Sequence, residues 1–218
     1  MDIEKVNKMI QTGNIDFSAN IEDVCFAKNK MIPKTSYLEF WDFTGANPLV
    51  GKNGTTLTLK GSGVTSGLYG INFQGGIGQG GFVLPSELCG EGKYYELQFG
   101  NFSGTFAYPN CPLVFSFGQY ENIEQMNKGL YYNTIQGKWM FDGTSTVTSN
   151  ISEKSPFANS LVRIEVDISR KPHIYVNGES WWNPNSAIDS NRPYFAIGGY
   201  PYYYMMQLQS LKIGDMII

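Results

Sequence analysis

The sequence of 218 residues contains little histidine, cysteine or charge. It has one histidine, His173, and three cysteines, Cys25, Cys89 and Cys111. An odd number of widely spaced cysteines excludes a complete set of intrachain disulfides and matches no metal-binding motif, so buried free thiols are expected. A single histidine cannot form a histidine-rich metal site, and the G-x-S-x-G nucleophile motif is absent.

Charged residues make up 16% of the chain, and the formal net charge is -3. The sequence contains no basic tract, which argues against nucleic-acid binding. No apolar run approaches the ~20 residues of a membrane span. The first residues, Met1 to Val6, lack the apolar core of a secretory signal. We therefore expect synthesis in the cytoplasm without a signal peptide, and no membrane insertion.

Glycine and aromatic residues are abundant, with 25 glycines and an aromatic content of 15%. This mixture is typical of many short strands joined by tight turns. The length suits one large all-β domain with a short appendage, and the spacing of turn signals favours two antiparallel sheets packed face to face. Strands are expected over 36–43, 55–60, 68–73, 80–84, 93–101, 112–118, 128–133, 137–141, 145–150, 160–168, 172–177, 193–199 and 204–214.

The clearest of these strands form a hairpin over residues 160–179. Residues 161–168 alternate so that Val162, Ile164, Val166 and Ile168 share one face. Ser169 to Pro172 forms a polar turn, and the returning strand ends at Asn177-Gly178, a dipeptide that tolerates positive φ. The pattern predicts a hairpin with one dry face and one wet face.

This hairpin, with its Ile-Tyr-Val-Asn-Gly-Glu run at 174–179, resembles the signature hairpin of laminin G-like, concanavalin A-like jelly-roll domains. Other segments resemble the family's strands in the same order: 40–43, 57–61, 70–73, 82–85, 195–199 and 206–214. The resemblance spans roughly residues 36–218 and implies a jelly-roll β-sandwich. The same fold carries lectins, glycosidases, lyases, adhesion modules and virion proteins, so it does not fix a function.

Residues 1–35 lie outside the resemblance and form a candidate docking arm. Ile3, Val6 and Ile10 would share one stripe of a helix over residues 2–12, and Phe17 would extend the contact. So short a helix is marginal in water unless something covers its apolar stripe. The arm is expected either to pack on its own domain or to dock on another subunit, with an extended, helical or mixed conformation.

Two motifs that suggest cofactors lack the necessary context. Residues 76–81 match G-x-G-x-x-G, but a strand ending in proline follows where a dinucleotide site needs a helix. The aspartates Asp42, Asp142, Asp189 and Asp215 are scattered and form no D-x-D-x-D cluster. We expect neither a cofactor nor a bound metal.

Glu165 and Asp167 match the first two positions of the E-x-D-x-E strand that laminarinase-type glucanases of this fold use. The third position is Ser169, so the acid/base carboxylate of that motif is absent. His173 starts a strand beside Pro172, where a surface or packing role is expected. The sequence therefore predicts no catalytic residues and no enzymatic activity.

Aromatic side chains concentrate in two expected loops. Trp181 and Trp182 precede Asn183 and Asn185, and Tyr200 and Tyr202 belong to a second loop at 200–204. Aromatic rings pack on the apolar faces of sugars, and amides bond their hydroxyls. Sugar contact, a protein–protein interface and simple core packing all account for this enrichment.

These observations favour a non-enzymatic binding or structural protein. The hypothesis is a virion-associated protein, such as a capsid decoration, tail or fibre protein of a phage. In this hypothesis the arm attaches to other structural subunits, and the sandwich adheres to host-surface glycans. The protein would lie on a virion or on the extracellular face of an assembly. Either a monomer or a homo-oligomer is compatible with this hypothesis. The alternatives are a glycan-active enzyme of the same fold, either a glucanase or a lyase, and a stand-alone lectin.

Overall fold

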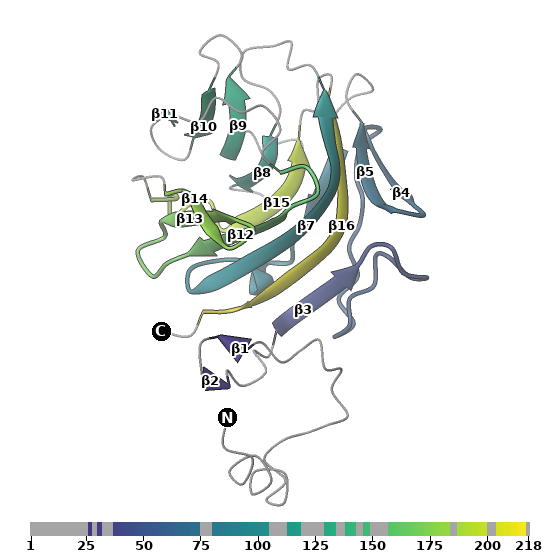
Figure 1. Ribbon diagram of the computed structural model, residues 1–218, viewed down its shortest axis with the longest axis horizontal. Helices are drawn as coiled ribbons and strands as arrows, with labels where there is room; N and C mark the ends of the chain where they lie inside the picture. The colour runs from purple at the N-terminus through teal and green to yellow at the C-terminus, as the bar shows by residue number, and fades with distance from the viewer. Residues whose placement is uncertain are drawn as a thin grey trace, which may run out of the picture. The chain divides into compact units, whose positions relative to one another are not determined.

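The computed structural model describes residues 26–27, 30–31, 37–74, 80–104, 113–118, 129–133, 138–142, 146–148, 157–183, 187–199 and 204–216 (Figure 1). The chain divides into two units, residues 1–36 and 37–218. In the first unit, β1 (Phe26–Ala27) and β2 (Lys30–Met31) pair antiparallel. The helix predicted over 2–12 lies outside the described residues, as do Ile3, Val6, Ile10 and Phe17.

The second unit is built from two antiparallel sheets, which confirms the predicted all-β sandwich. The larger, eight-stranded sheet has the order β14-β13-β12-β7-β16-β5-β4, and β3 also pairs with β16. Its strands are β3 (Tyr37–Asp42), β4 (Val64–Gly67), β5 (Gly70–Gln74), β7 (Lys93–Gly104), β12 (Leu161–Val166), β13 (Pro172–Val176), β14 (Glu179–Trp182) and β16 (Tyr204–Asp215). The long strands β7 and β16 run side by side and bend together (Figure 1).

The smaller, six-stranded sheet has the order β11-β10-β9-β8-β15-β6. Its strands are β6 (Gly80–Val83), β8 (Leu113–Gly118), β9 (Gly129–Asn133), β10 (Lys138–Asp142), β11 (Thr146–Thr148) and β15 (Tyr194–Gly199). A short 3₁₀ helix, η2 (Ser86–Leu88), follows β6. Among the residues that the structure describes, no helix has the length and apolar character needed to cross a bilayer.

Aromatic side chains fill the space between the two sheets. Trp41, Tyr95 and Phe195 are fully buried, and the Tyr95 ring stacks on Phe195 with centroids 4.2 Å apart. Cys89 is a buried free thiol, as predicted; its sulfur accepts from the Phe195 amide at 3.3 Å. Cys25 and Cys111 lie outside the described residues. The aromatic content of the sequence is thus partly explained by core packing.

The hairpin formed by β12 and β13 has the predicted two faces over most of its length. Val162, Ile164 and Val166 are buried, and Asn177 and Gly178 both adopt positive φ (52° and 83°). The prediction for Ile168 is wrong, because this side chain is 69% exposed. The strand ends at Val166, so the alternation stops where the backbone begins to turn.

Three further differences concern strands. The strand predicted over 55–60 forms only two isolated bridges, Val50 with Thr56 and Lys60 with Gly81, although Leu57 is buried as its alternation suggested. Strand β4 was missed because only Val64 of its four residues is buried. Strand β14 is not predicted, because the sequence analysis places Trp181 and Trp182 in a loop after the hairpin.

Candidate functional site

A polar groove lies on the large sheet where β4, β5, β16 and β7 are neighbours. It encloses about 270 Å³ and has a solvent-open side. Its walls combine hydroxyl and amide groups with the edges of two core side chains. The lining residues are Thr65, Asn72, Phe73, Gln74, Asn101, Met206 and Gln207.

Strand register brings the polar side chains of the groove together. Asn72 on β5 pairs with Thr65 on β4 and with Gln207 on β16. Their sequence neighbours Ile71 and Leu208 are buried in the core. Because successive residues of a strand point to opposite faces, Thr65, Asn72 and Gln207 form a polar row on the outer face of the sheet.

Two amides of this row are held in place by hydrogen bonds. Gln207 Nε2 donates to Asn72 Oδ1 at 3.2 Å, and Asn72 Nδ2 donates to the Gly70 carbonyl at 3.5 Å. The Gln207 Oε1 atom and the remaining N–H groups are left for other partners. Within the part of the chain that the structure describes, the side chains of Thr65, Gln74 and Asn101 make no hydrogen bond. The groove therefore offers both donors and acceptors.

Irregular pairing between β7 and β16 adds a third amide beside the groove. The register shifts between Met206 and Leu208 and again between Leu208 and Ser210, as at β-bulges. A Cβ atom on Gly100 would lie 2.4 Å from Gln207 Oε1 and 2.9 Å from Gln209 Nε2. Glycine at position 100 therefore allows both glutamine amides to lie flat on β7.

A charged cluster occupies another part of the same outer face, on β12, β7 and β16. Arg163 Nε donates to Glu165 at 2.7 Å, and its Nη1 donates to Glu96 at 2.7 Å. Lys212 also contacts Glu96, at 3.4 Å, and the Arg163 guanidinium lies 4.0 Å from the centre of the Tyr94 ring. Burial lowers the pKa of Arg163, but the hydrogen bonds that it donates to both glutamates, together with their charges, outweigh burial and raise the pKa.

Glu96 and Glu165 are the two carboxylates of this cluster, and a glycosidase would need such a pair. Because both bond one guanidinium, their bonded oxygens lie no more than about 8 Å apart, within the span of glycosidase carboxylates. However, Arg163 lies between Glu96 and Glu165 and bonds both carboxylates, and Lys212 also contacts Glu96, so both glutamates are engaged in ion pairs. Burial, together with the hydrogen-bonded Glu165 carboxylate, raises the pKa of Tyr175, which keeps this phenol protonated.

Asp167, in the turn after β12, forms a separate pair with His173 on β13. His173 Nε2 lies 3.0 Å from Asp167 Oδ2, while Asp167 Oδ1 accepts from the Ser169 and Lys171 amides. Burial raises the pKa of Asp167, but its contact with His173 and the two backbone bonds outweigh it and lower the pKa. These bonds close the turn, which gives both side chains a structural role.

The structure does not bring the sequence-predicted binding residues to the groove. Trp181 and Trp182 lie in strand β14, not in a loop, and both are half-buried. The Trp181 ring packs edge-on against Trp139 and Phe157, at 5.8 and 5.1 Å. The loop placement was wrong because the chain resumes pairing directly after the turn.

The remaining predicted residues are also separate from the groove or lie outside the described residues. Asn183 follows β14 and donates to Ser180 at 3.3 Å. Asn185, Tyr200 and Tyr202 lie outside the described residues. Four strands separate β14 from β5, which is about 24 Å at normal strand spacing. The sequence analysis does not identify the groove residues, although the alternation of apolar and polar residues in 70–74 is a signal that could place Asn72 on an outer face.

The described residues contain no group of three or more histidine, cysteine, aspartate or glutamate side chains arranged to hold a metal ion. Asp42 bonds Thr44, Asp189 bonds Arg192 and Asp215 bonds Lys93. Each of these carboxylates therefore has its own partner within the domain.

Comparisons with known proteins find similarity in structure alone. No family model matches the sequence, and no curated protein matches it. A Trypanosoma rangeli sialidase structure, in complex with 2,3-difluoro-KDN, has a TM-score of 0.58 at 12% identity, covering 98% of this chain and 36% of that one. A second structure of that enzyme, with 2,3-difluorosialic acid, gives 0.55 at 14%, covering 86% and 32%.

Botulinum neurotoxin binding domains share the fold as well. The receptor-binding domain of the C/D mosaic serotype has a TM-score of 0.51 at 13% identity, covering 84% of this chain and 48% of that one. The serotype D ligand-binding domain in complex with N-acetylneuraminic acid gives 0.50 at 14%, with the same coverage. The chain thus spans about a third to a half of these proteins, and the similarity defines a β-sandwich fold.

Proposed function

We propose that the sandwich is a non-enzymatic carbohydrate-binding module and that the groove on β4, β5, β16 and β7 is its binding site. The observation that carries the proposal is the row of uncharged amide and hydroxyl side chains from Thr65 through Asn72 to Gln207. Sugar hydroxyls both donate and accept hydrogen bonds, as amides do. Placing these groups on paired strands fixes their spacing before a ligand arrives.

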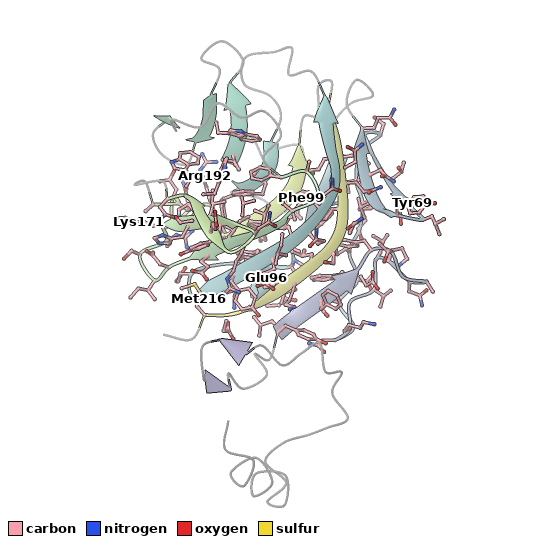
Figure 2. The ribbon with its side chains drawn as sticks, in the orientation of Figure 1. Tyr69, Glu96, Phe99, Lys171, Arg192 and Met216 are labelled. Carbon is pink, nitrogen blue, oxygen red and sulfur yellow. The ribbon has the colours of Figure 1, made fainter. Side chains whose placement is uncertain are left out.

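An apolar surface for the sugar ring is available nearby. Leu68 and Tyr69 form the tip of the β4–β5 hairpin and are 78% and 68% exposed. Tyr69 is labelled at the end of this hairpin in Figure 2. It lies three residues from Asn72, about 10 Å along an extended chain. An exposed tyrosine next to amide groups is a combination suited to the C–H faces and hydroxyls of a saccharide.

The structural comparisons support a sugar ligand at the level of fold. The T. rangeli sialidase structures and the serotype D toxin domain were each solved with a sugar acid bound. Sandwiches of this architecture therefore occur in proteins that handle carbohydrate. Function still has to be assigned from the site of this chain, since one fold carries many activities.

Mutation of the groove tests the proposal against the sequence-predicted site. We expect Asn72→Ala and Gln207→Ala each to weaken binding of a saccharide, selected from a glycan panel, by about 10-fold or more, the effect of losing one to two hydrogen bonds. Asn183→Ala, beside the two tryptophans, should leave the affinity unchanged. Titration calorimetry provides the measurement. Loss of binding in Asn183→Ala with retention in both groove variants would place the site at β14 instead.

A glycan-active enzyme is the second candidate, favoured by the proximity of Glu96 and Glu165. The proposal of a non-enzymatic module predicts no turnover of β-glucans or alginate, because Arg163 holds both carboxylates in ion pairs. Turnover by the full chain that disappears in Glu165→Gln would establish the enzyme and overturn the non-enzymatic assignment.

The proposed setting is a larger assembly, such as a phage particle, with residues 1–35 as the attachment segment and the sandwich turned toward host glycans. Its support is the division of the chain into units at residues 36 and 37 and the apolar stripe predicted in the arm.

A further inference from the structure

We infer that the groove selects an uncharged saccharide and discriminates against sugars that carry a carboxylate or sulfate. This inference rests on the proposed function of the groove and adds the chemical class of its ligand. It also separates this chain from the structurally similar proteins solved with sugar acids.

The first argument is the charge of the groove wall. None of the described residues that line the groove is charged. The cations on the same face, Arg163 and Lys212, are bonded to Glu96. Lys212 is also five residues from Gln207 along β16, about 16 Å in an extended strand. An anionic group in the groove would therefore lose part of its hydration without gaining an opposite charge from the described lining residues, which is unfavourable.

The second argument is the mixture of donors and acceptors. Gln207 Nε2 already donates to Asn72 Oδ1, so the Gln207 carbonyl oxygen is presented as an acceptor above Gly100. A hydroxyl can donate to this oxygen while accepting from Asn72 or Thr65. A carboxylate or sulfate only accepts, so it would face the Gln207 oxygen without a proton to share.

The size of the groove limits how much of a glycan it can hold. Its volume of about 270 Å³ is slightly below the range of about 300–1,000 Å³ that is usual for ligand sites. One or two sugar rings fit this volume, so a longer glycan would be recognised through a terminal or internal unit. The charge of that unit then decides whether it binds.

Paired neutral and anionic sugars test the inference directly. The full chain would be titrated with neutral disaccharides (lactose, maltose, cellobiose) and with anionic counterparts such as 3′-sialyllactose and uronic-acid disaccharides. We expect at least one neutral sugar to bind, its anionic counterpart to bind at least 10-fold more weakly, and the neutral affinity to change less than twofold between 50 and 500 mM salt, since no ion pair forms.

Groove variants tie the result to this site. Asn72→Ala should weaken binding of the neutral sugar by about 10-fold or more, and Gln207→Lys should shift the preference toward the anionic one. Asn191→Ala removes an exposed amide in the turn before β15 and serves as the matched control. Circular dichroism and thermal unfolding would confirm that each variant is folded.

The two levels of the proposal fail in different ways. If an anionic sugar binds as tightly as its neutral counterpart and Asn72→Ala weakens that binding, the groove is a carbohydrate site and the inference of neutral selectivity is overturned. If no saccharide binds the full chain, or if the affinity is unchanged in both Asn72→Ala and Gln207→Ala, the proposed function of the groove itself is overturned.

Discussion

At the scale of single residues, Glu39 is the most unusual side chain in the described sandwich, because its carboxylate is fully buried without a cation. It is held by the loop after β3. Its oxygens accept from the amides of Phe40, Asn53 and Thr55 at 2.8 to 3.0 Å. Burial raises the pKa of Glu39, but these bonds outweigh it and place the pKa below the ordinary value of 4.5.

Replacement of Glu39 by glutamine should destabilise the domain in a pH-dependent way. Because the folded-state pKa lies below that of the unfolded chain, ionised Glu39 stabilises the fold above the unfolded pKa of about 4.3. That stabilisation is lost as the pH falls through the folded pKa. We expect Glu39→Gln to lower the free energy of unfolding by about 2 kcal/mol at pH 7, and by less at pH 3.5, in urea titrations.

The exposed Glu179 provides the control for this prediction. Glu179→Gln should change the free energy of unfolding by less than about 0.5 kcal/mol at either pH. An effect of Glu39→Gln that is the same at pH 7 and pH 3.5 would show that the loop does not stabilise the charged carboxylate.

At the scale of elements, one arginine joins the β12–β13 turn to the loop before β15. Arg170 donates to the carbonyls of Ile188 at 3.0 Å and Asp189 at 2.9 Å, and to Glu91 at 3.0 Å. Its own carbonyl accepts from the Ile188 amide at 2.8 Å. In Figure 2, the label Lys171 marks the β12–β13 turn and the label Arg192 marks the loop before β15.

Loss of the Arg170 guanidinium should release this loop more than it disturbs the sheets. We expect Arg170→Ala to lower the free energy of unfolding by about 2 kcal/mol and to speed hydrogen exchange at residues 187–192. Arg170→Lys should behave similarly, since an ammonium cannot reach several carbonyls at once. Lys171→Ala, at the exposed neighbour, is the control. Unchanged hydrogen exchange in both Arg170 variants would show that Arg170 does not hold this loop.

How far the sequence predicts the molecule differs between the strands and the site. Local alternation located most strands within one or two residues, because burial on one face leaves a period of two in sequences such as 161–166. It failed at β4, where Val64 is the single buried residue, and at 55–60, where Leu57 packs without regular pairing.

The groove could not be predicted in the same way because it depends on register between distant strands. Asn72 and Gln207 are 135 positions apart, and nothing local to either indicates that they are neighbours. The aromatic residues at 181–182 predict a binding loop, whereas the structure packs the Trp181 ring against Trp139 and Phe157. Apolar surface is used for packing first, so an aromatic cluster alone does not distinguish a core from a binding site.

At the scale of the whole molecule, deletion of residues 1–34 separates the roles of the two units. If the arm is an attachment segment, the truncated chain should keep a cooperative thermal transition within a few degrees of the full chain but fail to join its assembly. Calorimetry and co-sedimentation with the assembly would measure the two properties. Strong destabilisation would instead show that the arm completes the core, and full incorporation would remove the attachment role.

The pairing of β16 also has a consequence for how the chain reaches its folded state. This strand pairs with β3, β5 and β7, and its contact from Asp215 to Lys93 closes a separation of 122 positions. Contacts so distant along the chain make folding slow, on the order of milliseconds to seconds. During synthesis, the edges of β3, β5 and β7 that pair with β16 remain unpaired until residues 204–215 have left the ribosome. We therefore expect a nascent chain of this protein to expose unpaired strand edges, which favour aggregation, until β16 has been made.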